Sequence, residues 1–165
     1  MDGVIVDTMD LHFEASSRAF KEHGLEVSKE ELKKFLTDSG FEVQDVGAFA
    51  YNKDDDYVDF AASAAKELVK APASDRGIFI CGSGHGMAIV ADKFKGLRSA
   101  LAFNRDVAIQ SREHEDANVL VLASDWLQIG EAKEIVLVWL KTPFSGEARH
   151  ERRLGKIREI EENNF

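Results

Sequence analysis

The stretch that decides the fold runs from Gly77 to Ala91 and reads Gly-Ile-Phe-Ile-Cys-Gly-Ser-Gly-His-Gly-Met-Ala-Ile-Val-Ala. Its first five residues form a short apolar run, which predicts a buried strand over Gly77–Cys81. Three glycines at alternate positions follow, and the apolar run after them predicts a helix over Met87–Lys93. A buried strand that leads through a glycine loop into a helix is typical of a parallel sheet wrapped by helices.

The same alternation of short apolar runs and longer stretches of helical period continues along the chain. Further strands are predicted at Gly3–Val6, Phe41–Val46, Arg98–Phe103 and Asn118–Leu122. Further helices are predicted at Leu11–His23, Lys29–Ser39, Tyr57–Lys70, Val107–Glu113, Gly130–Lys141 and Arg149–Glu161. We therefore expect an α/β fold: a Rossmann-like, three-layer α/β/α arrangement with a five-stranded parallel sheet. The length of 165 residues suits a single domain, residues 1–165.

Two of the predicted helices carry apolar residues at helical spacing. In the helix from Tyr57 the expected buried stripe consists of Phe60, Ala61, Ala64 and Leu68. The closing helix places Leu154, Ile157 and Ile160 along one side between charged residues. This pattern predicts that the closing helix packs on the core through these three side chains.

Composition and charge narrow the classes of protein and partner. The formal net charge of -9 disfavours a nucleic-acid partner, although local arginines can still bind a small anion. The single cysteine excludes an intrachain disulfide and favours a reducing compartment. No apolar run is long enough to span a membrane, and the N-terminus does not resemble a secretory signal. We expect a cytoplasmic protein with no membrane partner.

The glycine loop after Cys81 is the strongest local signal for chemistry. Alternate glycines let backbone N–H groups converge, and a following helix N-terminus adds positive potential. Such a loop can hold a phosphate or an enediolate oxygen, and it is expected to lower the pKa of Cys81 towards a thiolate. The alternative is a buried small thiol followed by a tight turn. The glycine spacing does not fit a dinucleotide-binding fingerprint.

From about Glu31 to the C-terminus the chain carries a series of motifs in a recognisable order. They are Glu31-Leu-Lys-Lys-Phe-Leu, Phe41-Glu-Val-Gln-Asp-Val-Gly, Asp56-Tyr57, Arg76-Gly-Ile-Phe-Ile-Cys-Gly-Ser-Gly, Lys93-Phe-Lys-Gly-Leu-Arg, Arg112-Glu-His-Glu-Asp-Ala-Asn-Val-Leu and Gly146-Glu-Ala-Arg-His-Glu-Arg-Arg. This order and spacing resemble the type B ribose-5-phosphate isomerases and the related galactose-6-phosphate isomerase subunits. The resemblance implies an aldose–ketose isomerase of a sugar phosphate, with ribose 5-phosphate as the first candidate, and no metal or organic cofactor.

The resemblance assigns roles to the residues of the glycine loop. Cys81 matches the thiolate base that carries a proton between C1 and C2 through an enediolate. Ser83 keeps the hydroxyl that helps to move the proton between O1 and O2. His85 is either a substrate contact or an exposed side chain. The backbone amides from Gly82 through Gly84 to Gly86 would stabilise the enediolate oxygen.

Further site residues are implied outside the loop. His114 matches the acid that opens the sugar ring, a role that imidazole can fill near neutral pH; its alternative is a helix-end cap. Glu115 replaces a usual asparagine beside it, and Tyr57 matches a tyrosine that lines the sugar site. A core aromatic is the alternative for Tyr57.

A basic group at the start of the closing helix is implied to bind the phosphate. Arg149 and Arg153 lie four residues apart with His150 between them, and guanidinium groups suit phosphate through their paired donors. A solvated basic face paired with neighbouring carboxylates is the alternative. Asp125 stands where many members of the family carry another arginine, so one expected phosphate contact is missing.

The first 31 residues depart from the family, which has Asp-His-x-Gly-Phe after its first strand. They resemble instead the start of a haloacid dehalogenase-type phosphatase, with Asp2 matching the second aspartate of Asp-x-Asp-Gly. The nucleophilic aspartate would precede Met1, so phosphatase activity is not expected. We expect Val4-Ile-Val6 to serve as the first parallel strand, with Asp7, Asp10 or His12 near the missing pair.

The resemblance also implies an assembly. Members of the family are homodimers or dimers of dimers in which each pocket is built from two subunits, so a partner chain would bring His114 or the arginines to Cys81. The alternative function is a non-catalytic sugar-phosphate-binding or partner-subunit member, motivated by Glu115, Asp125 and the missing N-terminal motif.

Overall fold

The computed structural model describes residues 3–8, 29–47 and 56–164. Its strands form one sheet of five members in the order β2-β1-β3-β5-β4, and every neighbouring pair is parallel. The strands are β1 (Gly3–Thr8), β2 (Glu42–Asp45), β3 (Arg76–Cys81), β4 (Ser99–Leu101) and β5 (Val119–Ala123). The predicted α/β class with a parallel sheet is confirmed. The prediction that Val4–Val6 supplies a parallel strand is confirmed as well, since β1 pairs with both β2 and β3.

Six helices are assigned within the described residues. They are α2 (Lys29–Asp38), α3 (Tyr57–Leu68), α4 (His85–Ala91), α5 (Arg105–Glu115), α6 (Ile129–Lys141) and α7 (Ala148–Asn164). Side-chain caps explain two of the starting points, because Asp56 accepts from the Val58 amide at 3.2 Å and Asn104 accepts from the Val107 amide at 2.9 Å. The predicted helix Leu11–His23 lies outside the described residues.

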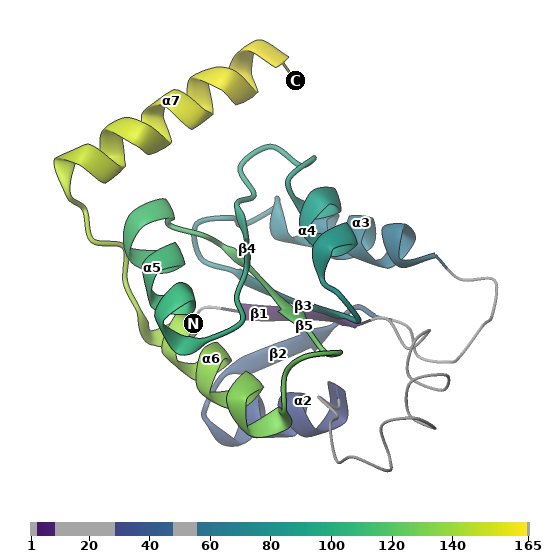
Figure 1. Cartoon of the computed structure of the whole chain (residues 1–165). Coiled ribbons are helices and arrows are strands. Elements are labelled where there is room, and N and C mark those ends of the chain that lie inside the picture. Colours follow the sequence, from purple (N-terminus) through teal and green to yellow (C-terminus); the bar gives the residue numbers. More distant parts are fainter. Residues whose placement is uncertain (1–2, 9–28, 48–55, 165) are drawn as a thin grey trace.

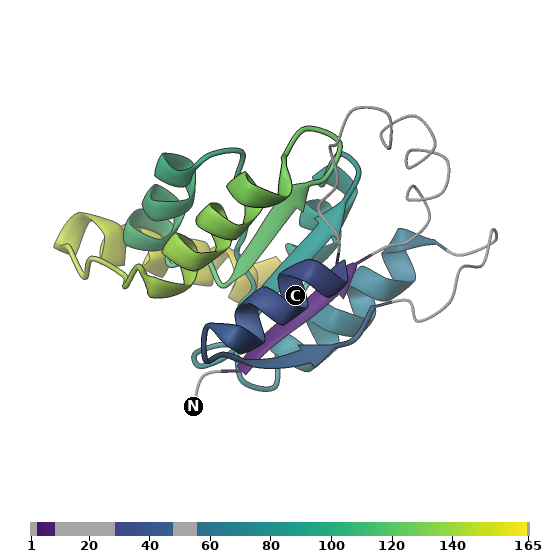
Figure 2. The ribbon, with the colours of Figure 1, turned by 90° about the horizontal axis from the view of Figure 1, so that it is seen from below.

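The helices form two layers on opposite faces of the sheet, with α3 and α4 on one face and α2, α5 and α6 on the other (Figures 1 and 2). The sheet packs against both helical layers, because successive side chains along a strand point to opposite faces of the sheet. In β3, Ile78 and Ile80 join the core with Trp139 of α6, whereas Phe79 joins the core with α3 and α4. Both faces of β3 and β5 are therefore buried, as a strand of a parallel sheet requires.

The predicted apolar stripes need two corrections. In α3 the buried residues are Ala61, Ala64, Ala65 and Leu68, whereas Phe60 is only half-buried. In α7 only Leu154 packs on the core among the three residues expected to do so, since Ile157 is 37% exposed and Ile160 is 60% exposed. The prediction that α7 packs on the core through all three side chains is therefore wrong.

The reason for the α7 error is the position of the helix. Figure 1 shows α7 standing apart from the two helical layers. Its far end is held by a polar contact, in which the Gly96 amide donates to Glu161 Oε1 at 3.0 Å. Helical spacing identifies an apolar side of a helix, but it does not say whether the same chain covers that side.

No helix in the described part of the chain combines the length and the apolar character needed to cross a membrane.

Candidate active site

Cys81 closes β3, and the loop after it turns sharply into α4. The turn depends on Gly84, whose φ of 75° lies in the left-handed region and whose added Cβ would come within 2.6 Å of Leu101 Cδ1. A Cβ at Gly86 would come within 2.5 Å of the Tyr57 ring, so this ring packs directly on the loop backbone. The glycines therefore shape a close-fitting loop beside a half-buried thiol.

The charge state of Cys81 is set by opposing effects. Burial raises the pKa of the Cys81 thiol above its ordinary value, and hydrogen bonds from the backbone amides of Gly84, Gly82 and Ser83 act in the opposite direction. The negative charge of Asp125 adds to the rise. The expected net lowering of this pKa is wrong, because desolvation and a neighbouring carboxylate outweigh the loop amides.

Asp125 lies against the loop and does not extend away from it. Its carboxylate would be 2.9 Å from a Cβ added at Gly82, and its amide donates to the Gly82 carbonyl at 3.1 Å. The Ser124 amide likewise donates to the Cys81 carbonyl at 3.0 Å. The segment after β5 is thereby fixed to the segment after β3, which is the edge of a parallel sheet where ligands usually bind.

An aromatic side chain at this edge was missed by sequence reasoning. Trp126 is 64% exposed, and its ring meets the exposed His85 ring edge-on with the centroids 6.2 Å apart. Its position just beyond a predicted strand is the signal that would have identified it, since the residues after each strand line that edge. Tyr57, Ser83, Asp125 and Trp126 thus surround the region of Cys81.

A second group of predicted site residues gathers where α5 ends and α7 begins. The His114 and His150 rings contact each other with centroids 4.3 Å apart and planes inclined by 32°. His150 is buried, and its Nδ1 lies 2.7 Å from Ser145 Oγ. Arg149 is exposed and forms an ion pair with Glu147 at 2.9 Å, and Arg153 is exposed as well.

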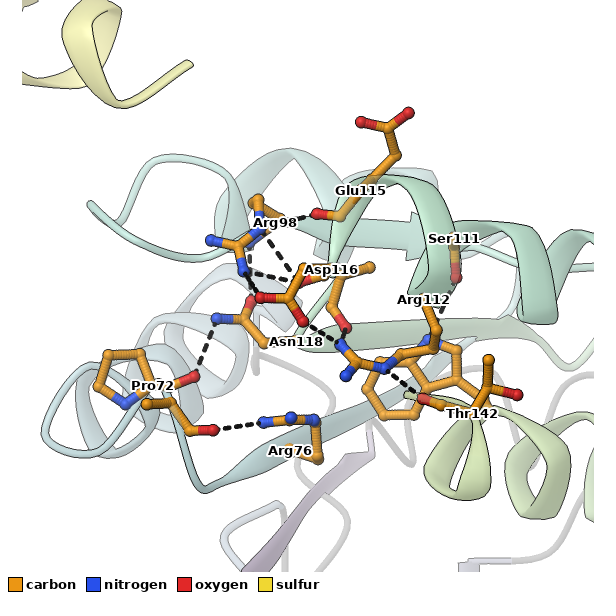
Figure 3. Close-up of polar contacts among 12 residues, drawn as sticks. Pro72, Arg76, Arg98, Ser111, Arg112, Glu115, Asp116, Asn118 and Thr142 are labelled. Atoms are coloured by element: carbon orange, nitrogen blue, oxygen red, sulfur yellow. Dashed lines mark hydrogen bonds and ion pairs between the residues drawn. The ribbon is translucent and has the colours of Figure 1, made fainter. Parts of the chain in front are cut away.

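The end of α5 is held by a cluster of charged residues (Figure 3). Asp116 has φ 44° and binds two guanidinium groups: its Oδ1 contacts Arg112 Nη1 and its Oδ2 contacts Arg98 Nη2, both at 2.9 Å. Arg112 is 4% exposed, donates to the Thr142 carbonyl at 3.2 Å and lies over the Trp139 ring. Burial and the charge of Arg76 lower the pKa of Arg112, and Asp116 opposes this. The cluster fixes the turn next to His114 and Glu115.

Within the chain these two groups lie at opposite ends of the sheet. Cys81 is at the carboxyl end of β3, whereas α5 returns the chain to the amino end of β5 and carries His114 in its last turn. Arg98, which directly precedes β4, donates from its Nε to the Glu115 carbonyl at 2.9 Å, which places Glu115 at the amino end. The structure therefore brings Tyr57 and Ser83 to Cys81, but it does not bring His114, Glu115, His150 or the arginines there.

The two predicted N-terminal contacts, Asp7 and Asp10, have side chains that the structure does not describe. Asp10 lies outside the described residues, and for Asp7 the backbone alone is placed, in β1 opposite Phe79 of β3. Among the residues that the structure describes, no group of three or more His, Cys, Asp or Glu side chains is arranged to hold a metal ion.

Comparison with known proteins identifies relatives along most of the chain. The Ribose/Galactose Isomerase family matches residues 20–157. The putative sugar phosphate isomerase YwlF of Bacillus subtilis (strain 168) is 40% identical over 144 residues, which cover 87% of this chain and 95% of that protein. The ribose-5-phosphate isomerase B of Mycolicibacterium paratuberculosis is 38% identical over 133 residues, with coverage of 81% and 83%.

Solved structures agree with these relatives. The ribose-5-phosphate isomerase B of Mycoplasma genitalium with bound ribulose-5-phosphate has a TM-score of 0.84 at 31% identity, covering 98% of this chain and 97% of that one. The type B ribose 5-phosphate isomerase of Trypanosoma cruzi has a TM-score of 0.83 at 33% identity, with full coverage of both chains. The haloacid dehalogenase-like character of residues 1–31 stays a prediction. On the shared sequence and fold, the chain belongs to the ribose/galactose isomerase family.

Proposed function

We propose that the chain interconverts an aldose phosphate and a ketose phosphate, with ribose 5-phosphate and ribulose 5-phosphate as the first pair to test. The observation that carries the proposal is the placement of Cys81 at the carboxyl end of β3, where the amides of Gly82, Ser83 and Gly84 hydrogen-bond its sulfur. Membership of the family and the ribulose-5-phosphate bound to the Mycoplasma genitalium relative support it.

The proposed reaction begins with the open-chain aldose. The Cys81 thiolate removes the proton from C2, the C1–C2 double bond forms, and O1 becomes an enediolate oxygen that the loop amides stabilise. The O2 proton passes to O1 through the Ser83 hydroxyl. The Cys81 thiol then returns its proton to C1, which leaves a hydroxymethyl group at C1 and a carbonyl at C2.

Ring opening and phosphate binding are assigned to the second group of residues. His114 donates the proton to the ring oxygen, Arg149 and Arg153 hold the phosphate, and Glu115 contacts the sugar. Because this group and Cys81 lie at opposite ends of the sheet, we propose that each site combines the Cys81 end of one copy with the His114 end of a second copy. Exposed apolar side chains, among them Trp126 and Ile160, support a second copy as the partner.

The N-terminal contacts belong to the same proposal. β1 runs parallel to β3, and Thr8 pairs with Ile80, so the chain leaves β1 at the edge where Cys81 lies. Asp7 and Asp10 are proposed to contact the sugar there in place of the family's Asp-His pair.

The test compares the isomerisation of ribose 5-phosphate by the wild-type protein and by Cys81→Ala. We expect the substitution to lower kcat by about 100-fold to 10,000-fold, the usual contribution of a positioned acid–base group. Ser74→Ala, in the exposed turn before β3 and outside the assigned catalytic and binding residues, is the control and is expected to retain activity. A wild-type protein that binds ribose 5-phosphate without converting it would contradict the proposal and favour a non-catalytic, sugar-phosphate-binding subunit.

A further inference from the structure

The segment that joins α6 to α7 is bonded to the last turn of α5 at the two residues just before His114. Upstream of His114, Arg112 donates from Nε to the Thr142 carbonyl at 3.2 Å. The Ser145 amide donates to the Glu113 carbonyl at 3.2 Å. These bonds bring Ser145 and the first turn of α7 to the part of α5 that carries His114.

His150 is fixed in this junction through both its backbone and its side chain. Its amide donates to the Glu147 carbonyl at 2.8 Å, and its Nδ1 lies 2.7 Å from Ser145 Oγ. Ser145 Oγ also accepts from the Glu147 amide at 3.3 Å, so the serine that holds the His150 ring is itself fixed to the start of α7.

The fixed ring covers one side of the His114 imidazole. His150 is 1% exposed and His114 is partly exposed, with 4.3 Å between the ring centroids. His150 Nε2 is buried and has no hydrogen-bond partner among the residues that the structure describes. An apolar ring would fill the same space without a buried polar atom, so a histidine at this position requires an explanation.

We propose that His150 is a positioning residue: its ring, locked by Ser145, orients the His114 imidazole for opening of the sugar ring. The inference rests on the proposed function, in which His114 is the ring-opening acid. The family resemblance implied a phosphate contact for His150, but its burial beneath His114 leaves that contact to the exposed Arg149 and Arg153.

The step that depends on this orientation is defined by the chemistry of the furanose. The His114 imidazolium donates its proton to the ring oxygen O4, the C1–O4 bond breaks, and the proton on O1 leaves to solvent. The product is the open-chain aldehyde with a free hydroxyl at C4. Such a proton transfer needs a donor held in line with O4, since small errors in orientation lower the rate steeply.

The experiment separates ring opening from the chemistry at Cys81. Isomerisation of ribose 5-phosphate starts from a closed furanose and requires both steps. Ribulose 5-phosphate cannot close this ring because its C5 oxygen is phosphorylated, so incorporation of solvent deuterium at its C1 requires Cys81 but no ring opening. Both rates are measured on the full chain for the wild-type protein, His114→Ala, His150→Phe and Ser145→Ala.

We expect His150→Phe to lower kcat for ribose 5-phosphate by about 100-fold, as expected for a misplaced catalytic group. Ser145→Ala keeps the ring and removes its lock, so a smaller loss in the same direction is expected. Deuterium incorporation into ribulose 5-phosphate should stay within about two-fold of the wild type in both variants, because binding and enolisation do not use His114. Arg152→Ala, at an exposed position in the same helix, should leave both rates unchanged.

Three results would overturn the inference. An equal loss of both rates with a raised KM would make His150 a phosphate ligand or a structural residue. Unchanged isomerisation in His150→Phe and Ser145→Ala, beside a loss in His114→Ala, would show that His114 needs no positioning by His150. A wild-type protein with neither activity would refute the proposed function itself, and the inference would fail with it. Ser145→Ala keeps the test valid if His150→Phe does not fold.

Discussion

The two ends of the sheet are built by different physical means. At the carboxyl end, the Cys81 loop relies on close backbone packing, with glycines where a Cβ would collide with Leu101 or Tyr57. At the amino end, the α5–α7 junction relies on charged side chains, with Asp116 between two guanidinium groups. The first end is therefore sensitive to added volume, and the second is sensitive to lost charge.

The largest effect is expected from removing the buried charge at the amino end. Arg112→Ala deletes a guanidinium that is 4% exposed and leaves Asp116 and the Thr142 carbonyl without this donor. We expect the free energy of unfolding to fall by about 3 kcal/mol, at the low end of the range for a broken buried pair because Asp116 is partly exposed. Urea denaturation measures this.

The matched control for that change lies in the same helix. Arg105 is exposed, and its distances of 3.7 Å to Glu134 and 4.0 Å to Asp106 are those of a surface ion pair. Arg105→Ala should therefore change the free energy of unfolding by less than about 0.5 kcal/mol. Equal losses in the two variants would mean that burial does not distinguish these arginines.

A smaller loss of stability is expected when a side chain is added to the glycine loop at the carboxyl end of the sheet. Gly86→Ala would place a Cβ 2.5 Å from the Tyr57 ring, which must move or displace the loop. We expect a loss of about 2 kcal/mol, together with a fall in activity because the loop amides shift relative to Cys81. Gly130→Ala is the control, since its Cβ would meet open space in α6 and should be neutral or slightly stabilising. Full activity in Gly86→Ala would show that the loop tolerates displacement.

The smallest effect concerns the charge state of Cys81. Burial raises the pKa of the Cys81 thiol most, and the charge of Asp125 adds to the rise, so Asp125→Asn should lower this pKa. At a fixed pH below the midpoint a larger fraction of Cys81 is then thiolate, and the acid limb of the activity profile should move to lower pH. The pH dependence of iodoacetamide alkylation measures the midpoint directly, because Cys81 is the only cysteine.

Asp106→Asn, at an exposed position in α5, controls for the change in net charge. A midpoint that rises in Asp125→Asn would mean that the carboxylate supports the thiolate, contrary to the electrostatic argument.

Most of the strands and helices could be predicted from the local pattern of apolar residues along the sequence. Each of the five predicted strand segments overlaps an observed strand, and the helix boundaries within the described residues are matched to within a few positions. The reason is that β3 and β5 are apolar on both faces and that Asp56 and Asn104 cap helices through their own side chains. The exposure of Ile160 could not be predicted, because the helical spacing of apolar residues does not reveal which other element, if any, packs against them.

The candidate site was predictable in its residues but not in its electrostatics. The resemblance already implied that His114 or the arginines come to Cys81 from a partner chain, and within this chain the two groups lie at opposite ends of the sheet. The raised pKa of Cys81 depends on burial and on Asp125, which follows a different strand. Neither effect is visible in the glycine spacing that led to the opposite expectation.

The sequence by itself determined the family, the α/β class, the strand that ends at Cys81 and the glycine loop beyond it. These follow from local spacing of apolar residues and glycines, which depends on neighbours along the chain. The tertiary structure alone decided that Asp125 faces the thiol side of the loop, that Arg98 and Arg112 share Asp116, and that His150 lies buried against His114. Each of these depends on residues distant in the chain that meet only once helices have packed on the sheet.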